Sequence, residues 1–231
     1  MLGLMQRQPL LISSLIDFAA RHHGDGEIVS RRVEGDVHRY TWKDVRQRSM
    51  QVAHALEKGG ISTGQRVATL AWNGYRHLEL YYGVSGSGRV LHTINPRLHP
   101  EQVAWIVSHA EDQVLAFDTS FLPMVQSIAG KCPGVRLWIA LCEKDQLPVD
   151  SGIPGLLSYE DWIDGHLAEY PWPDLDENVA SSLCYTSGTT GNPKGVLYSH
   201  RSTLLHAYAA AWPDVMNLSA RDSMMPVVPM F

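Results

Sequence analysis

The segment 185–195 has the composition of an anion-binding loop. It reads Tyr185-Thr186-Ser187-Gly188-Thr189-Thr190-Gly191-Asn192-Pro193-Lys194-Gly195. Its glycines allow successive backbone N–H groups to converge on one point, because positive φ angles carry no steric cost for glycine. Further donors are supplied by one lysine and four hydroxyl side chains: Lys194, Thr186, Ser187, Thr189 and Thr190. Each hydrogen bond to a charged phosphate contributes about 1.5–3 kcal/mol, so several of them together would hold a polyphosphate.

A flexible linker built of small residues is the alternative interpretation of this segment. Against it stands the Pro193-Lys194 pair, which follows the apolar run 181–186 (SSLCYT) at a fixed distance. That run is predicted to be a strand that leads directly into the loop. We therefore expect a phosphate-binding loop.

The spacing differs from that of the P-loop of kinases and GTPases. That motif requires a glycine, four residues and then Gly-Lys-Ser/Thr. Counting from Gly188 places Pro193 where the second glycine should be, and Gly195 follows the lysine. Residues 195–200 (GVLYSH) also have strand character, so they would not form a helix whose N-terminus faces the phosphate. The sequence thus predicts a different phosphate-binding design.

The run 185–195 closely resembles the phosphate-loop signature of the acyl-adenylate-forming enzymes, which include acyl-CoA synthetases, firefly luciferase and the adenylation domains of peptide synthetases. Three further segments resemble the fatty-acyl-CoA synthetase branch: 92–118, 198–202 (YSHRS) and 227–231 (VVPMF). The resemblance covers the whole chain but less than half of such an enzyme. In the family a histidine and an acyl-pocket segment follow the PMF sequence, and a small C-terminal domain carries a catalytic lysine. We therefore expect an N-terminal fragment that is inactive alone.

The resemblance implies an ATP-dependent acyl-CoA ligase. Such an enzyme converts a carboxylic acid and ATP into an acyl-adenylate and pyrophosphate, and coenzyme A then displaces AMP. By resemblance, Thr186 would bind Mg²⁺ and Lys194 would stabilise charge on the leaving pyrophosphate. The remaining loop residues would hold the phosphates: Ser187, Gly188, Thr189, Thr190 and Gly191. The acid is left open among fatty, aryl and short sulfur-containing acids, and the alternative function is a non-catalytic nucleotide- or phosphate-binding module.

The amino-acid composition argues against some binding partners and some cellular compartments. With 231 residues, 45% of them hydrophobic, and a net charge of −5, the chain is globular and lacks the basic surface that nucleic acid or an anionic membrane would require. Three cysteines, an odd number without a CxxC pair, argue against a disulfide framework or a structural zinc site: Cys132, Cys142 and Cys184. A cytoplasmic protein is expected, and a homodimer is left open.

The N-terminal apolar run is interrupted by Asp17 and lacks a basic flank, so it predicts an amphipathic helix rather than a signal peptide or a membrane span. Its expected apolar face consists of Leu11, Leu15, Phe18 and Ala19. Among the histidines, those at positions 22, 23, 54 and 109 are expected at the surface or at helix ends. His92 is expected to have a positioning role. His200 and Arg201 are expected to support the loop by hydrogen bonding.

Helical and apolar segments alternate along the rest of the chain, which predicts an α/β fold of largely parallel sheets covered by helices. For the family this corresponds to a layered αβαβα large domain. The predicted helices are 42–58, 75–88, 100–112, 121–131 and a short one within 159–167, and the predicted strands are 65–72, 89–95, 113–118, 135–141 and 181–186. We expect a first α/β unit at 1–170 and the start of a second sheet unit, carrying the loop, at 171–231.

Overall fold

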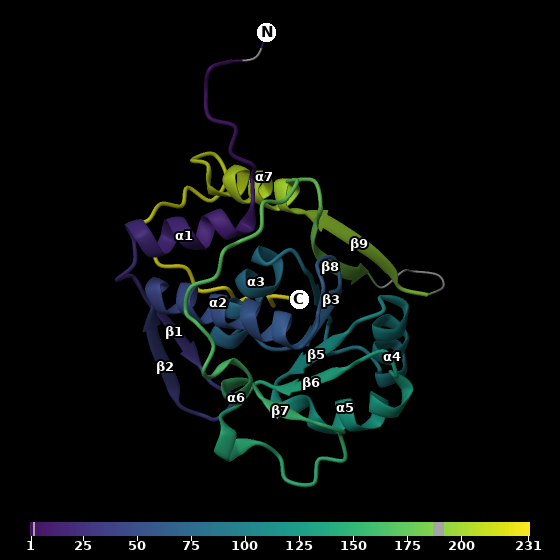
Figure 1. The fold of residues 1–231 in the computed structure, drawn as a ribbon. Helices are drawn as coiled ribbons and strands as arrows, with labels where there is room; N and C mark the ends of the chain where they lie inside the picture. Colours follow the sequence, from purple (N-terminus) through teal and green to yellow (C-terminus); the bar gives the residue numbers. More distant parts are fainter. Residues whose placement is uncertain (2, 187–191) are drawn as a thin grey trace.

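A seven-stranded sheet forms the centre of the computed structural model, which describes residues 1, 3–186 and 192–231 (Figure 1). Its strand order is β7-β6-β5-β3-β4-β8-β9. The strands are β3 (Arg66–Leu70), β4 (Val90–Thr93), β5 (Val114–Phe117), β6 (Leu137–Ala140), β7 (Leu157–Ser158), β8 (Ala180–Thr186) and β9 (Lys194–Ser199). Neighbouring strands are parallel, except that β8 and β9 are antiparallel. The predicted fold class, a largely parallel sheet covered by helices, is confirmed.

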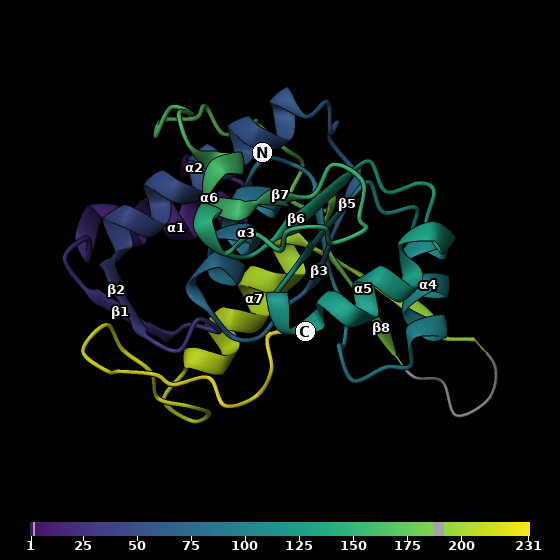
Figure 2. The same cartoon turned by 90° about the horizontal axis from the view of Figure 1, so that it is seen from below.

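Helices cover both faces of the sheet (Figure 2). One face carries α4 (Pro100–His109) and α5 (Leu122–Ile128), and the other carries α2 (Trp42–Lys58), α3 (Tyr75–Gly86) and α6 (Tyr159–Ile163). Strand β5 shows why: Leu115 and Phe117 belong to the apolar core beneath the first pair of helices, whereas Val114 belongs to the core beneath the other three. Successive side chains of a strand point to opposite faces, so an all-apolar strand builds two cores at once.

Helix α2 shows how a local sequence signal fixes a boundary. The Thr41 hydroxyl accepts a hydrogen bond from the Asp44 backbone N–H, and the Asp44 carboxylate accepts one from the Thr41 N–H at 2.8 Å. This capping box satisfies two donors that a helix start otherwise leaves unpaired. The buried face of the helix includes Val45, Ser49, Val52, Ala53 and Leu56.

The N-terminal helix α1 (Ile12–His22) is present, but its predicted apolar face is only partly right: Leu11 is buried, whereas Leu15 and Ala19 are half-buried. The buried positions include Ile12, Ile16 and Ala20, whereas Phe18 is 57% exposed. Ile16 packs with Tyr40 and with residues of α2 and α3, so the stripe at spacing four faces the core. The sequence around this helix is apolar on more than one side, and the packing partners decide which side is buried.

The short strand β7 was not predicted, and neither were three further elements. Strands β1 (Glu27–Arg31) and β2 (Val37–Thr41) form an antiparallel hairpin that is largely exposed, so it lacks a strong apolar pattern. Helix α7 (His200–Ala211) follows β9 directly, and Ser199 caps it by accepting from the Ser202 N–H. Its apolar residues are mostly exposed, so it too lacks a clear stripe.

Strand β8 pairs in parallel with β4 and therefore joins the same sheet as β3–β7. The described residues contain this one large sheet and the small β1–β2 hairpin. The division of the chain near residue 170 and the five-layer arrangement stay predictions. No helix in the described part of the chain combines the length and the apolarity that crossing a membrane requires.

Candidate functional site

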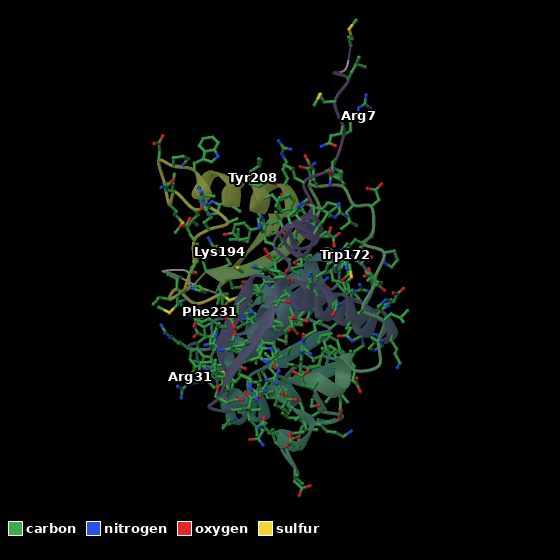
Figure 3. The ribbon with its side chains drawn as sticks, turned by 90° about the vertical axis from the view of Figure 1, so that its left-hand side faces the viewer. Arg7, Arg31, Trp172, Lys194, Tyr208 and Phe231 are labelled. Atoms are coloured by element: carbon green, nitrogen blue, oxygen red, sulfur yellow. The ribbon has the colours of Figure 1, made fainter. Side chains whose placement is uncertain are left out.

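The β8–β9 hairpin brings together the two predicted site residues that the structure describes. Thr186, the last residue of β8, lies directly opposite Lys194, the first residue of β9. Residues opposed across an antiparallel pair project from the same face, with Cβ atoms about 4.5–5.5 Å apart. Both side chains are exposed (Lys194 is labelled in Figure 3). The other predicted loop residues lie outside the described part of the chain: Ser187, Gly188, Thr189, Thr190 and Gly191.

The next pair down the hairpin, Tyr185 and Gly195, explains the glycine at the end of the motif. A Cβ atom at position 195 would lie 3.2 Å from Cζ of Tyr185 and 3.2 Å from Cδ1 of Leu183. These distances are tighter than ordinary van der Waals contact, so a side chain there would displace the tyrosine ring. Glycine therefore allows the Tyr185 ring to lie across strand β9.

Tyr185 also ties the hairpin to helix α4. Its hydroxyl is 2.6 Å from Nδ1 of His109, and the His109 ring stacks on Trp105 with centroids 4.5 Å apart. His109 is exposed at the end of the helix, as predicted. The contact anchors the strand one residue before Thr186, so the position of that hydroxyl is set by the sheet and by α4.

A buried histidine–aspartate pair lies next to the same strands. Nδ1 of His92, on β4, is 2.8 Å from Oδ2 of Asp112, and both side chains are fully buried. Burial raises the pKa of Asp112, and the neighbouring His92 opposes that rise. The His92 ring lies 5.2 Å from the Tyr185 ring, and its backbone pairs with Leu183 of β8. This geometry supports the predicted positioning role of His92.

The hairpin opens at the carboxyl edge of the parallel sheet. Strands β4 and β8 run in parallel, and Thr93 pairs with Cys184 near that edge, where their side chains meet at 3.4 Å. The chain leaves β3 toward α3 on one face and leaves β4 toward α4 on the other. Ligands of open parallel sheets bind in the crevice at such a switch point. Thr186 and Lys194 therefore lie at the edge where the topology predicts a ligand.

The side chains at this edge suit an anion. They do not suit a metal ion whose ligands all come from the protein. Thr186 offers a hydroxyl and Lys194 an ammonium group, which together match a phosphate. Within the described residues, no three His, Cys, Asp or Glu side chains converge into a metal-binding group. Mg²⁺ in nucleotide sites is commonly held by substrate phosphates plus few protein ligands. The residues present therefore fit a nucleotide phosphate that carries its own Mg²⁺.

His200 and Arg201 do not contact the described ends of the loop. His200 is fully buried, and its Nδ1 accepts a hydrogen bond from the Ile12 N–H at 3.2 Å. Arg201 pairs with Glu177, whose other carboxylate oxygen accepts from the Leu10 N–H at 2.8 Å. Within the described residues, these two side chains join the start of α7 to the N-terminal segment instead of supporting Thr186 or Lys194.

Sequence reasoning missed a second set of polar residues at the carboxyl edge. Asn73, in the loop after β3, forms three hydrogen bonds with the backbone of residues 226–230. Tyr81 of α3 donates a fourth to the Met230 carbonyl. No local pattern identified Asn73, because its partners are more than 150 positions away in the sequence.

Comparison with known proteins agrees with this geometry. The family model described as AMP-binding enzyme matches residues 16–231. The medium-chain-fatty-acid–CoA ligase of Ectopseudomonas oleovorans is 53% identical over 231 residues, which is 100% of this chain and 42% of that protein. The 3-methylmercaptopropionyl-CoA ligase of Ruegeria pomeroyi is also 53% identical, over 100% of this chain and 43% of that protein.

A solved structure is similar as well. The anthranilate CoA ligase AuaEII in complex with anthranoyl-AMP superimposes with a TM-score of 0.74 and 26% identity, over 87% of this chain and 37% of that one. The chain thus spans less than half the length of each of these three proteins. The family model covers nearly all of the described sheet, including the β8–β9 hairpin. The chain therefore belongs to the AMP-binding enzyme family.

Proposed function

We propose that the whole protein is an ATP-dependent acid–thiol ligase that converts a carboxylic acid into its CoA thioester through an acyl-adenylate. The observation that carries this proposal is the pairing of Thr186 with Lys194 at the carboxyl edge of the sheet. Two relatives that share 53% of their residues with this chain are named CoA ligases. A solved neighbour holds an acyl-adenylate.

The proposed reaction has two displacements. An oxygen of the acid's carboxylate attacks the α-phosphorus of ATP, the bond from that phosphorus to the bridging oxygen breaks, and pyrophosphate leaves. The sulfur of CoA then attacks the acyl carbon, AMP leaves, and the thiol proton passes to solvent. The first step depends mainly on positioning and on neutralising charge.

Each described site residue has a definite part in the first step. Lys194 places its positive charge beside the phosphates and stabilises the charge that develops on the leaving pyrophosphate. Thr186 orients the same phosphates through its hydroxyl and offers one oxygen ligand for Mg²⁺. When bound, Mg²⁺ neutralises part of the phosphate charge. Tyr185 and Gly195 keep both residues in register by fixing the hairpin against α4.

We propose an aliphatic acid as the substrate. The two relatives at 53% identity are named for a medium-chain fatty acid and for 3-methylmercaptopropionate, both aliphatic, whereas the aryl-acid ligase is 26% identical. We also propose a cytoplasmic location, which agrees with three cysteines that are free in the described structure. A homodimer is a further proposal that oligomer measurements on the whole protein would test.

The test is ATP–pyrophosphate exchange by the full-length protein, measured without CoA against octanoate, 3-methylmercaptopropionate and anthranilate. We expect exchange that depends on the acid, fastest with an aliphatic one, and thioester formation once CoA is added. Lys194→Ala is the matched inactive control. ATP binding without exchange on any acid would overturn the ligase proposal in favour of a nucleotide-binding module.

A further inference from the structure

We propose that Asn73 is a positioning residue that clamps the segment 226–231 across the carboxyl ends of β3 and β4, with Tyr81 as a second anchor. This inference rests on the proposed function, since it assigns that segment to one wall of the acid–nucleotide crevice. In this proposal Asn73 does not touch the reacting atoms. Its effect is exerted through the backbone that it holds.

The side-chain amide of Asn73 is fully used by this one segment. Its Nδ2 donates to the carbonyl oxygens of Pro226 at 2.8 Å and of Val228 at 2.9 Å, and its Oδ1 accepts from the Met230 N–H at 2.7 Å. The contacted residues alternate along the chain. The chain bends at Val228, and all three backbone groups lie within reach of the one side chain. Only an amide side chain offers both donors and an acceptor in this arrangement.

Hydrogen bonds hold the backbone of the loop that carries Asn73. The Trp72 N–H donates to Oδ2 of Asp118 at 2.6 Å, and Nδ1 of the buried His77 lies 3.1 Å from the Trp72 carbonyl oxygen. These bonds fix the backbone one residue before Asn73. Tyr81, whose ring lies 5.2 Å from the His77 ring, donates its hydroxyl proton to the Met230 carbonyl. Two elements, the loop after β3 and helix α3, therefore hold the same segment.

The held segment has little apolar packing of its own. Val227 and Val228 are each 78% exposed, and none of residues 226–231 is buried in the described structure. Within the described residues, the contacts of this segment are therefore mainly those of the polar clamp. The clamp lies at the carboxyl ends of β3 and β4, so the segment is at the same edge of the sheet as Thr186, the last residue of β8.

Hydrogen–deuterium exchange on the full-length protein tests the clamp without using its activity. The Met230 amide donates to Asn73, so Asn73→Ala should raise its exchange rate about tenfold. Tyr81→Phe, which removes only a hydroxyl, should also raise it. Asn217→Asp, at an exposed turn, is the control and should leave it unchanged. An unchanged Met230 rate in Asn73→Ala, or an equal rise throughout β3 and α3, would overturn the proposal.

Steady-state kinetics test what the clamp does. If the segment forms a wall of the acid site, Asn73→Ala should raise the KM for the acid about tenfold and change the KM for ATP much less. An equal loss for both substrates, or none, would overturn the positioning role. If the wild-type protein shows no acid-dependent ATP–pyrophosphate exchange, the proposed function is wrong. The hydrogen–deuterium exchange result would still decide whether the clamp exists.

Discussion

Thr186 and Lys194 are cross-strand partners at the open end of the β8–β9 hairpin. The strand pairing fixes the threonine hydroxyl and the lysine stem on one face of the hairpin. The loop between them joins two antiparallel strands, and helix α7 begins only after β9. This arrangement differs from a P-loop, where the phosphate lies at a helix N-terminus. In the proposed site, the phosphates would therefore be held without a helix dipole.

Replacing Lys194 by Ala should slow adenylate formation by about a hundredfold or more, because the charge acts on the leaving pyrophosphate. Acid affinity should change much less. Single-turnover adenylation and acid binding by the full-length protein measure the two effects separately. Lys144→Ala is the control, since that lysine is exposed and pairs with Asp161 at 3.3 Å on α6. Equal losses of rate and acid affinity would mean that Lys194 only shapes the site.

Replacing Thr186 by Val removes one hydroxyl while keeping the side-chain shape. We expect exchange to fall about tenfold and to require more Mg²⁺ for half-maximal rate, because one oxygen ligand and one phosphate contact are lost. The melting temperature should stay unchanged, since position 186 is exposed and valine favours strands. Thr63→Val, at an exposed loop, is the control. Unchanged Mg²⁺ dependence would contradict the assigned role.

The sequence predicted those features that depend on local signals. Examples are the helix predicted at 42–58, which is α2, and the strand predicted at 181–186, which lies within β8. It did not predict features that depend on distant partners. The buried face of α1 depends on which side meets Tyr40 and Tyr75, and the clamp between Asn73 and Met230 joins residues 157 positions apart. Such pairings follow from the three-dimensional fold, which no short window of sequence contains.

The pH dependence of stability should carry a contribution from Asp118. Burial raises the pKa of Asp118 from 3.8 to about 6, although the Trp72 N–H opposes this. The folded state therefore binds the proton more tightly, so this contribution is complete below pH 3.8 and is lost as the pH rises through 6. It amounts to about 3 kcal/mol at most.

Asp118→Asn should remove this contribution. Urea unfolding at pH 4, 5, 6 and 7 measures the free energy of unfolding. The value for the variant should increase relative to that of the wild type as the pH rises. A difference between the two proteins that stays constant from pH 4 to 7 would show that Asp118 titrates alike in both states.

Thr41→Ala should lower the free energy of unfolding by about 1 kcal/mol, because it removes the acceptor that caps α2. Catalytic constants should stay unchanged, since this helix start is remote from the β8–β9 hairpin. Denaturant unfolding measures the loss, and Thr63→Ala at an exposed loop serves as the control. A loss no larger than that of the control would mean that the capping box contributes nothing measurable.

The most direct test of the account is a structure of the full-length protein with a non-hydrolysable ATP analogue. We predict β- and γ-phosphate oxygens within about 3 Å of the Thr186 hydroxyl and the Lys194 ammonium. A triphosphate bound elsewhere, with neither side chain in contact, would contradict it.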